Sequence, residues 1–389
     1  MNNADAVGRG TGPAQRGVYG DFRLICVSAV EINIDCGFIH EVILDSFVGG
    51  GIGLRCLLAS MDGMSSAAFR SVCFDYGADG ATTEMIGAAG IARAKRRHRP
   101  ITEALLTRRP EEGELAAQLL GSDPAVMAEA ARRLEALERF DLIEINMGCP
   151  ARVAIRSGNG AALLREPERC DEILRAVCGA VALPVRLKLR LGWDDEHITA
   201  PEIARMAQDA GVKAIILHGR TRQQMYAGEV QIEQMRKVRA AVTIPFYANG
   251  AVVRPEDAAA FAAATGADGV CIGRAALKSP WIFADIRALK RGDAAADRDA
   301  RERIDVLLRF AERLCAQKPE HFAIAEMRKY SKWYLEGLIG ADAAFERVKR
   351  AETLDEFRRI HEDLLNERVR ANDLRIHPEL IRTPAFETR

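Results

Sequence analysis

The chain has 389 residues, of which 48% are hydrophobic, and its 55 basic residues are balanced by 55 acidic ones. This length allows a large buried core, predicts one large and one smaller domain, and excludes a wholly basic protein, although not a basic face. The nine cysteines include no Cys-x-x-Cys pair. An odd, scattered set argues against a zinc ribbon, an iron–sulfur cluster and a disulfide scaffold, and favours the reducing cytoplasm.

The first 53 residues are interpreted as an N-terminal extension of undefined structure. Residues 1–20 are polar and rich in glycine, which is not typical of a signal peptide. The apolar stretch that follows is interrupted by Glu31, Asp35 and Glu41. A membrane-spanning helix needs about 20 consecutive apolar residues. We therefore expect no membrane segment here.

From Leu54 onward, short apolar runs alternate with Ala-rich, charged segments of helical periodicity. Eight strands are predicted, within residues 54–61, 77–85, 114–121, 141–148, 184–192, 213–219, 244–250 and 268–274. Asp123 and Pro124 are predicted to cap and to start the helix after the third strand. Strand–helix alternation implies a parallel sheet, and eight units in about 220 residues match a (β/α)8 TIM barrel, here residues 54–292. A doubly wound sheet is disfavoured because no Gly-x-Gly-x-x-Gly turn follows the first strand.

After the barrel, the pattern changes to helices alone. Residues 293–300 are predicted to form a polar linker, 301–369 a small helical domain and 370–389 an irregular tail. Within the helical domain, Tyr330, Trp333 and Tyr334 share one helix face, which predicts core packing.

Polar and reactive side chains gather where the predicted strands end. Since TIM-barrel active sites lie at the carboxyl ends of the strands, these side chains predict a ligand site. They are Ser60, Met61, Asp62, Glu84, Gln118, Asn146, Cys149, Lys188, Arg190, His218, Arg220, Asn249 and Arg274.

Two of the strand ends indicate what kind of ligand is bound. The glycine-containing turns "ANGAV" (248–252) and "IGRAA" (272–276) follow the last two strands, where barrels frequently bind phosphate. Strand alternation places Lys188 inside the barrel, where a buried cation needs an anionic or carbonyl partner such as a flavin ring. No His-Glu-x-x-His motif or other metal-ligand spacing is present, so no metal is expected.

Several longer motifs occur in a characteristic order along the chain. They are "MDGMSSAAFR" (61–70), "IEINMGCPAR" (143–152), "RLKLRLGW" (186–193), "ILHGRTRQQMYAGE" (216–229), "TGADGVCIGRAA" (265–276) and "MRKYSKWYLEGLIGA" (327–341). In these motifs, from about Leu57 to about Leu364, the chain resembles the bacterial, FMN-dependent tRNA-dihydrouridine synthases. The resemblance implies a flavin-binding TIM barrel followed by a helical tRNA-binding domain.

The resemblance also implies a reaction and a role for Cys149. FMN, reduced by NADPH, would give a hydride to C6 of a uridine in tRNA, and the Cys149 thiol would give a proton to C5. A free cysteine has a pKa near 8.5, so the thiol form predominates at neutral pH. The glycine-containing run after Cys149 could then close over a base that has left its stack.

The family's other roles are carried over position by position. Residues implied in FMN binding are Ser60, Met61, Gln118, Asn146, Lys188, His218, Asn249, Gly250, Gly273 and Arg274. Residues implied in tRNA binding are Arg152, Arg156, Arg190, Arg328, Lys329 and Lys332. Ser60 departs from the family, which usually has proline at this position.

Two other functions are compatible with parts of the pattern. A flavin-dependent barrel that acts on a free small molecule, such as a dihydropyrimidine, would share the phosphate turns and a loop cysteine, but would not use a basic helical domain. An RNA-binding protein without catalysis would not need Cys149, Lys188 and His218. We expect a cytoplasmic monomer that acts on tRNA. The modified uridine position is left open.

Overall fold

The computed structural model describes residues 53–93 and 100–377. The predicted N-terminal extension, apart from Gly53, and the last twelve residues of the predicted tail lie outside the described residues.

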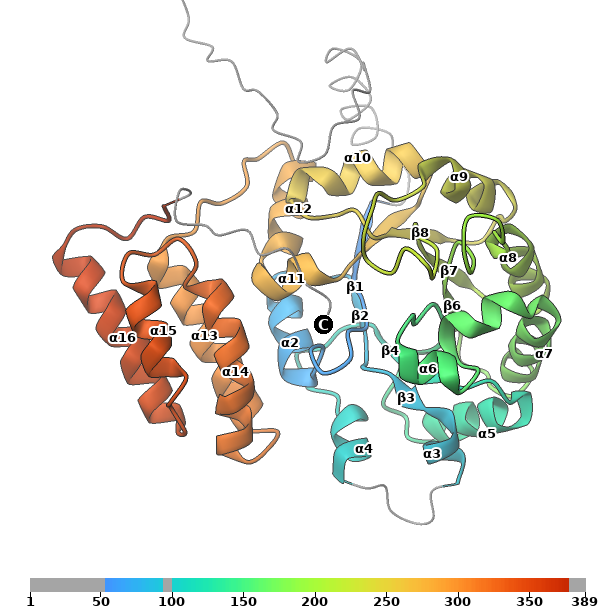
Figure 1. The fold of residues 1–389 in the computed structure, drawn as a ribbon, viewed down its shortest axis with the longest axis horizontal. Helices are drawn as coiled ribbons and strands as arrows, with labels where there is room; N and C mark the ends of the chain where they lie inside the picture. Colours follow the sequence, from blue (N-terminus) through green and yellow to red (C-terminus); the bar gives the residue numbers. More distant parts are fainter. Residues whose placement is uncertain (1–52, 94–99, 378–389) are drawn as a thin grey trace, which may run out of the picture. The chain divides into compact units, whose positions relative to one another are not determined.

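A closed parallel sheet forms the centre of the barrel (Figure 1). Its order is β2-β1-β9-β8-β7-β6-β5-β4-β3, and an additional β2–β4 pairing closes it. The strands are β1 Arg55–Leu58, β2 Gly80–Thr82, β3 Ile86–Gly87, β4 Leu115–Leu120, β5 Leu142–Met147, β6 Val185–Arg190, β7 Ala214–His218, β8 Phe246–Asn249 and β9 Gly269–Ile272. Each predicted strand range contains one of these strands, so the TIM barrel is confirmed.

The second barrel strand is interrupted. Both β2 and β3 pair with β4, with Ala81 opposite Leu115 and Ile86 opposite Leu119. The two short strands are therefore two parts of one barrel position, separated by residues 83–85.

Strand β6 shows how the sequence pattern sets the two faces of the sheet. Leu187 and Leu189 are fully buried in the core between sheet and helices. The alternate residues Arg186 and Lys188 point into the barrel, where they bond to Glu144 and Asn249. The predicted inward direction of Lys188 is confirmed.

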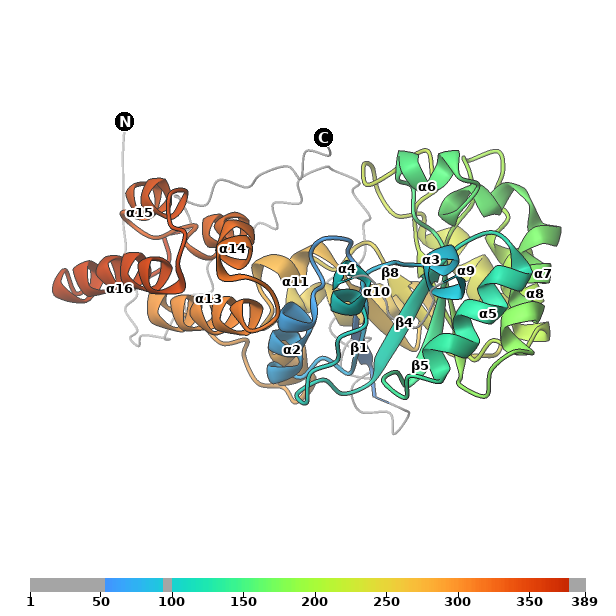
Figure 2. The same cartoon turned by 90° about the horizontal axis from the view of Figure 1, so that it is seen from below.

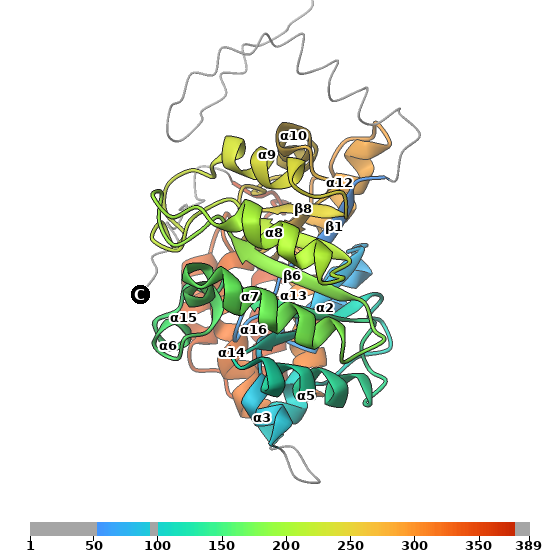
Figure 3. The same ribbon diagram turned by 90° about the vertical axis from the view of Figure 1, so that its right-hand side faces the viewer.

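Helices cover the outside of the sheet, and Figure 3 shows α5, α7 and α8 side by side. At the start of α5, the Asp123 carboxylate accepts a hydrogen bond from the Val126 N–H at 2.9 Å, which confirms the predicted cap. The barrel helices are α2 Ala67–Asp75, α3 Ala88–Ala92, α4 Pro100–Leu105, α5 Pro124–Glu135, α6 Arg152–Arg156, the 3₁₀ helix η1 Gly160–Arg165, α7 Pro167–Cys178, α8 Ala200–Asp209, α9 Ile232–Ala240, α10 Pro255–Thr265, α11 Arg274–Lys278 and α12 Ile282–Lys290.

Four further helices follow, drawn in orange to red in Figure 2. They are α13 Ala300–Cys315, α14 Glu320–Tyr334, α15 Ala341–Val348 and α16 Leu354–Arg370. Tyr330 and Tyr334 of α14 are fully buried and Trp333 is half-buried, so the predicted core packing of this stripe is confirmed.

The four helices share a hydrophobic core with the barrel. The Phe69 ring of α2 lies 5.4 Å from Phe310 of α13 and 6.1 Å from Tyr330 of α14, measured between centroids. One continuous cluster of buried residues includes these side chains and the outer face of the sheet. Within the described residues, no helix is long and apolar enough to cross a membrane.

Candidate active site

A cavity of about 700 Å³ opens at the carboxyl ends of the barrel strands. Cys149 and Arg190 both line it. So do all ten residues predicted to bind the flavin, which are Ser60, Met61, Gln118, Asn146, Lys188, His218, Asn249, Gly250, Gly273 and Arg274. The structure thus brings together side chains that come from seven different strand ends.

Hydrogen bonds fix both the N–H and the carbonyl group of Cys149. The Asn146 side-chain oxygen accepts from the N–H groups of Gly148 at 3.0 Å and Cys149 at 2.9 Å. The Cys149 carbonyl accepts from the Ala161 N–H at 3.0 Å. Gly160 has φ 61°, and a Cβ there would lie 2.8 Å from the Cys149 carbonyl oxygen. Glycine at position 160 is therefore required to let the loop pack against the cysteine.

A buried chain of side chains orients Asn146. Arg186 donates to Glu144 at 2.7 Å, Gln118 donates to Glu144 at 2.6 Å, and Asn146 donates to the Gln118 oxygen at 2.8 Å. Because an ionised carboxylate only accepts hydrogen bonds, Glu144 requires Gln118 to present its NH₂ group to it and its oxygen to Asn146. Glu144 was not recognised from the sequence, where it is one of two polar residues in an otherwise apolar strand.

Lys188 is one of the cations that line the cavity. Its ammonium donates to the Asn249 side-chain oxygen at 3.1 Å, and the Asn249 NH₂ donates to the Cys271 carbonyl at 2.6 Å. Burial lowers the pKa of Lys188. The Asn249 side chain thus positions Lys188, and its predicted contact with the phosphate stays a prediction.

The predicted phosphate end contains His218, Gly250, Gly273 and Arg274. Burial and the nearby cations, Arg190 foremost, lower the pKa of His218 well below its ordinary value, so the ring is neutral at pH 7. Its Nδ1 is buried and has no hydrogen-bond partner among the described residues. Gly250 has φ 122°, which favours glycine, and a Cβ there would lie 3.1 Å from the His218 ring.

Arg190 connects two loops around the cavity. Its guanidinium donates to the Gly148 carbonyl at 2.9 Å, to that of Thr221 at 3.0 Å and to that of Met225 at 2.6 Å. Arg190 therefore has a structural role, and its predicted contact with tRNA stays a prediction.

The cavity wall also contains Tyr226, which was not predicted as a site residue, and Asp62, which was predicted only as a strand-end residue without an assigned ligand. Tyr226 is 39% exposed, and the guanidinium carbons of Arg190 and Arg274 lie 5.2 and 5.1 Å from its ring centroid. Asp62 is exposed and follows Met61 directly. Tyr226 could have been predicted because it is an isolated aromatic residue in a polar loop. For Asp62, the sequence indicates only that it follows a strand end.

The Cys149 thiol lies in an environment that disfavours its ionisation. Burial raises the pKa of Cys149, and the negative charge of Asp62 acts in the same direction. The group is therefore a thiol at neutral pH, which is the form that can donate a proton.

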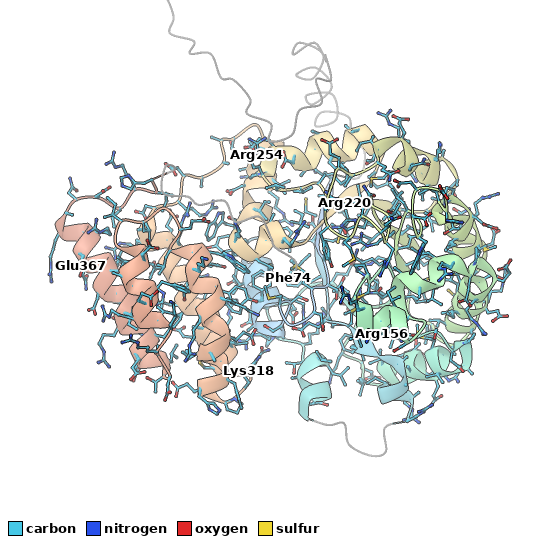
Figure 4. The ribbon with its side chains drawn as sticks, viewed as in Figure 1. Phe74, Arg156, Arg220, Arg254, Lys318 and Glu367 are labelled. Atoms are coloured by element: carbon cyan, nitrogen blue, oxygen red, sulfur yellow. The ribbon has the colours of Figure 1, made fainter. Side chains whose placement is uncertain are left out.

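The remaining predicted tRNA-binding residues do not line the cavity. Arg152 and Arg156 are exposed on α6 and make no hydrogen bond or ion pair with the described residues; Figure 4 labels Arg156. On α14, Arg328 donates to the Ala351 carbonyl at 2.8 Å, Lys329 donates to the Gly63 carbonyl at 2.8 Å, and Lys332 is exposed.

Comparisons with known proteins agree on one family. The family model described as dihydrouridine synthase matches residues 57–370. The tRNA-dihydrouridine synthase B of Vibrio cholerae is 38% identical over 303 residues, which cover 77% of this chain and 92% of the relative. That of Pseudomonas aeruginosa is 37% identical over 288 residues, covering 74% of this chain and 85% of the relative.

A solved structure supports the fold alone. Histamine dehydrogenase from Rhizobium sp. 4-9 aligns with a TM-score of 0.50 at 13% identity, over 74% of this chain and 53% of that one. The present chain thus matches about half the length of that enzyme. From the family match over residues 57–370 and the relatives at 37–38% identity, the chain belongs to the dihydrouridine synthase family.

Proposed function

We propose that this protein is an oxidoreductase that reduces the C5–C6 double bond of specific uridines in tRNA to dihydrouridine. The observation that carries this proposal is the position of Cys149. A thiol on a rigid turn lines the same cavity as the ten residues predicted to bind a flavin. Family membership and the two tRNA-dihydrouridine synthase B relatives support the substrate.

The cavity residues fit FMN. Its volume of about 700 Å³ lies within the range of about 300–1,000 Å³ that is usual for cofactor pockets. Ser60 Oγ and His218 Nδ1 are buried without partners among the described residues, so a ligand with polar edges would satisfy them. Lys188 offers a cation to an electron-rich ring edge. FMN, reduced by NADPH, would supply the hydride that adds to C6 of the uridine.

Cys149 would supply the proton to C5 on the other face of the uracil ring. Burial and Asp62 keep its pKa raised, so the proton is present at neutral pH. Asn146 holds the turn in place, so the thiol is positioned before the substrate arrives.

Contacts with tRNA would surround the cavity. Arg152 and Arg156 are exposed on the helix that follows Cys149 and are available for phosphates. Residues 301–369 would form the helical tRNA-binding domain, with Lys332 on an exposed face of α14. The target uridine must leave its stack to reach the cavity. We propose that the protein acts as a monomer in the cytoplasm, with its tRNA substrate.

The decisive experiment is a single-turnover oxidation of the photoreduced protein. Mixing with tRNA that lacks dihydrouridine should restore the oxidised flavin absorbance rapidly. Cys149→Ala should slow this step by about 10²–10⁴-fold, the usual contribution of a general acid. Cys178→Ala, which removes a half-buried thiol outside the cavity, is the matched control and should leave the rate unchanged.

Other outcomes would favour the alternatives. If only a free pyrimidine oxidises the flavin, the small-molecule oxidoreductase is correct. If the purified protein binds tRNA but no flavin, the proposed reaction is wrong.

A further inference from the structure

The loop between β1 and α2 forms part of the cavity wall. Met61, Asp62 and Met64 all line the cavity. The loop is a tight turn, in which the N–H groups of Met64 and Ser65 donate to the Met61 carbonyl at 3.0 and 2.9 Å. Gly63, at its tip, has φ 68°. The shape of this wall depends on how the turn is held.

Helix α14 holds this turn through two consecutive residues. The Lys329 ammonium donates to the Gly63 carbonyl at 2.8 Å, and the Tyr330 hydroxyl donates to the Met64 carbonyl at 3.1 Å. On the barrel side, the Gly63 N–H donates to the Glu84 carboxylate at 3.3 Å. Both carbonyls that α14 contacts therefore belong to the turn that carries Met61 and Asp62.

The Tyr330 side chain is closely packed. It is fully buried, and its ring packs edge-on against Phe310 and Trp333, with centroids 4.8 and 5.6 Å away. Because this packing restricts the ring, its hydroxyl donates to the Met64 carbonyl from a defined position.

Lys329 is directed toward the barrel rather than toward bulk solvent. Its ammonium lies 5.0 Å from the Tyr330 ring centroid and 3.9 Å from the Glu326 carboxylate. Burial lowers the pKa of Lys329. Lys332, three residues further along α14, is exposed instead. The two lysines, which were both predicted to face RNA, thus lie in different surroundings.

We propose that Lys329 and Tyr330 are positioning residues for the cofactor cavity, which act by fixing the Asp62–Met64 turn. This inference rests on the proposed function for the identity of the ligand, FMN. It gives α14 two roles, since its exposed face carries Lys332 for RNA while its inner face shapes the cavity wall. A tRNA bound on the exposed face of α14 would therefore contact the same helix that holds the cavity turn through Lys329 and Tyr330.

The test compares Lys329→Met with Lys332→Met, since each removes one positive charge from the same helix. Tyr330→Phe removes only the hydroxyl and keeps the packed ring. Amide hydrogen exchange of the 61–65 turn, measured without FMN, should be about fivefold faster in Lys329→Met and Tyr330→Phe and unchanged in Lys332→Met. Exchange in α5 and α7 should be unchanged in all three, which separates a local effect from general destabilisation.

FMN binding gives a second readout. We expect the FMN dissociation constant, followed by quenching of flavin fluorescence, to rise about five- to tenfold in Lys329→Met and Tyr330→Phe. Lys329→Arg should restore it, and Lys332→Met should lower tRNA affinity alone. The inference is overturned if Lys329→Met behaves like Lys332→Met, with normal turn exchange and weaker tRNA binding. Because the exchange measurement needs neither flavin nor tRNA, it decides the inference even if the proposed function fails.

Discussion

The acidity of the Cys149 thiol depends on what surrounds it in the cavity. Burial and the Asp62 carboxylate both raise its pKa, so the thiol persists at pH values where a free cysteine, with a pKa near 8.5, ionises. The proton-donating form is fully present below the raised pKa and is lost as the pH rises through it. The single-turnover rate should therefore stay constant through the ordinary thiol range and fall only at higher pH.

Removing the charge of Asp62 should lower the pH above which the single-turnover rate falls. In Asp62→Asn, no nearby carboxylate repels the Cys149 thiolate, so the pKa of Cys149 falls. The single-turnover rate should then begin to decline at a lower pH than in the wild type. The pH profile of single-turnover flavin oxidation measures this directly. Asp62→Glu, which keeps the charge, should retain the original profile. Identical profiles for wild type and Asp62→Asn would show that Asp62 does not act on Cys149.

Ser60 is one of the residues predicted to bind FMN, and it lines the cavity. Its hydroxyl is buried in the cavity wall without a partner among the described residues. If FMN satisfies this hydroxyl, Ser60→Ala should weaken FMN binding about fivefold, the value of one ordinary hydrogen bond. Titration with FMN measures the effect, and equal affinities of the two proteins would show that the hydroxyl makes no contact with the cofactor.

At the scale of secondary-structure elements, the segment from β5 to η1 determines where Cys149 lies. Gly158 and Gly160 both have positive φ, 70° and 61°, so alanine strains the backbone at either position by about 1–3 kcal/mol. Only at Gly160 would the new Cβ also meet Cys149, at 2.8 Å, whereas at Gly158 the nearest atom is 3.8 Å away.

The two glycines therefore form a matched pair of variants. Gly160→Ala should displace Cys149 and slow single-turnover flavin oxidation by about 10²-fold, while FMN affinity is retained. Gly158→Ala should lose a similar amount of stability but keep most of the rate. Equal rates for the two variants, at equal thermal stability, would contradict the role assigned to Gly160.

At the scale of the whole molecule, the helices α13–α16 complete the hydrophobic core of the barrel. Phe69 and Val72 of α2 are fully buried, and Phe69 packs against Phe310 and Tyr330. Each such side chain contributes about 1.5–3 kcal/mol when buried, and the net stability of a domain is only about 5–15 kcal/mol.

A chain that ends at Arg291 should consequently fail to fold as a stable barrel. We expect the truncated protein to bind the dye ANS, which reports exposed apolar surface, and to lack the cooperative thermal transition of the full chain. A truncated barrel with an unchanged melting midpoint would show that the helical region is an independent attachment.

Local patterns in the sequence were sufficient to predict the barrel. Alternation within β6 separated Leu187 and Leu189 from Lys188, because neighbouring side chains of a strand point to opposite faces whatever the rest of the fold does. The cap at Asp123 is equally local. Since the carboxyl ends of parallel strands meet at one end of a barrel, seven of the strand ends also supplied predicted residues that line the cavity. Glu84 and Arg220, which were predicted with them, do not line it.

What only the tertiary structure decided is which of these residues contact one another. Lys188 meets Asn249, 61 positions away, and Lys329 meets Gly63, 266 positions away. Such partners are set by closure of the sheet and by packing of α14 on the barrel, which depend on the summed burial of many apolar side chains rather than on any local pattern. The sequence by itself therefore determined the fold and predicted that residues at the strand ends surround one cavity, but it did not identify Glu144 or Tyr226. The three-dimensional packing determined that Lys329 faces the cavity wall and that Glu144 orients Asn146.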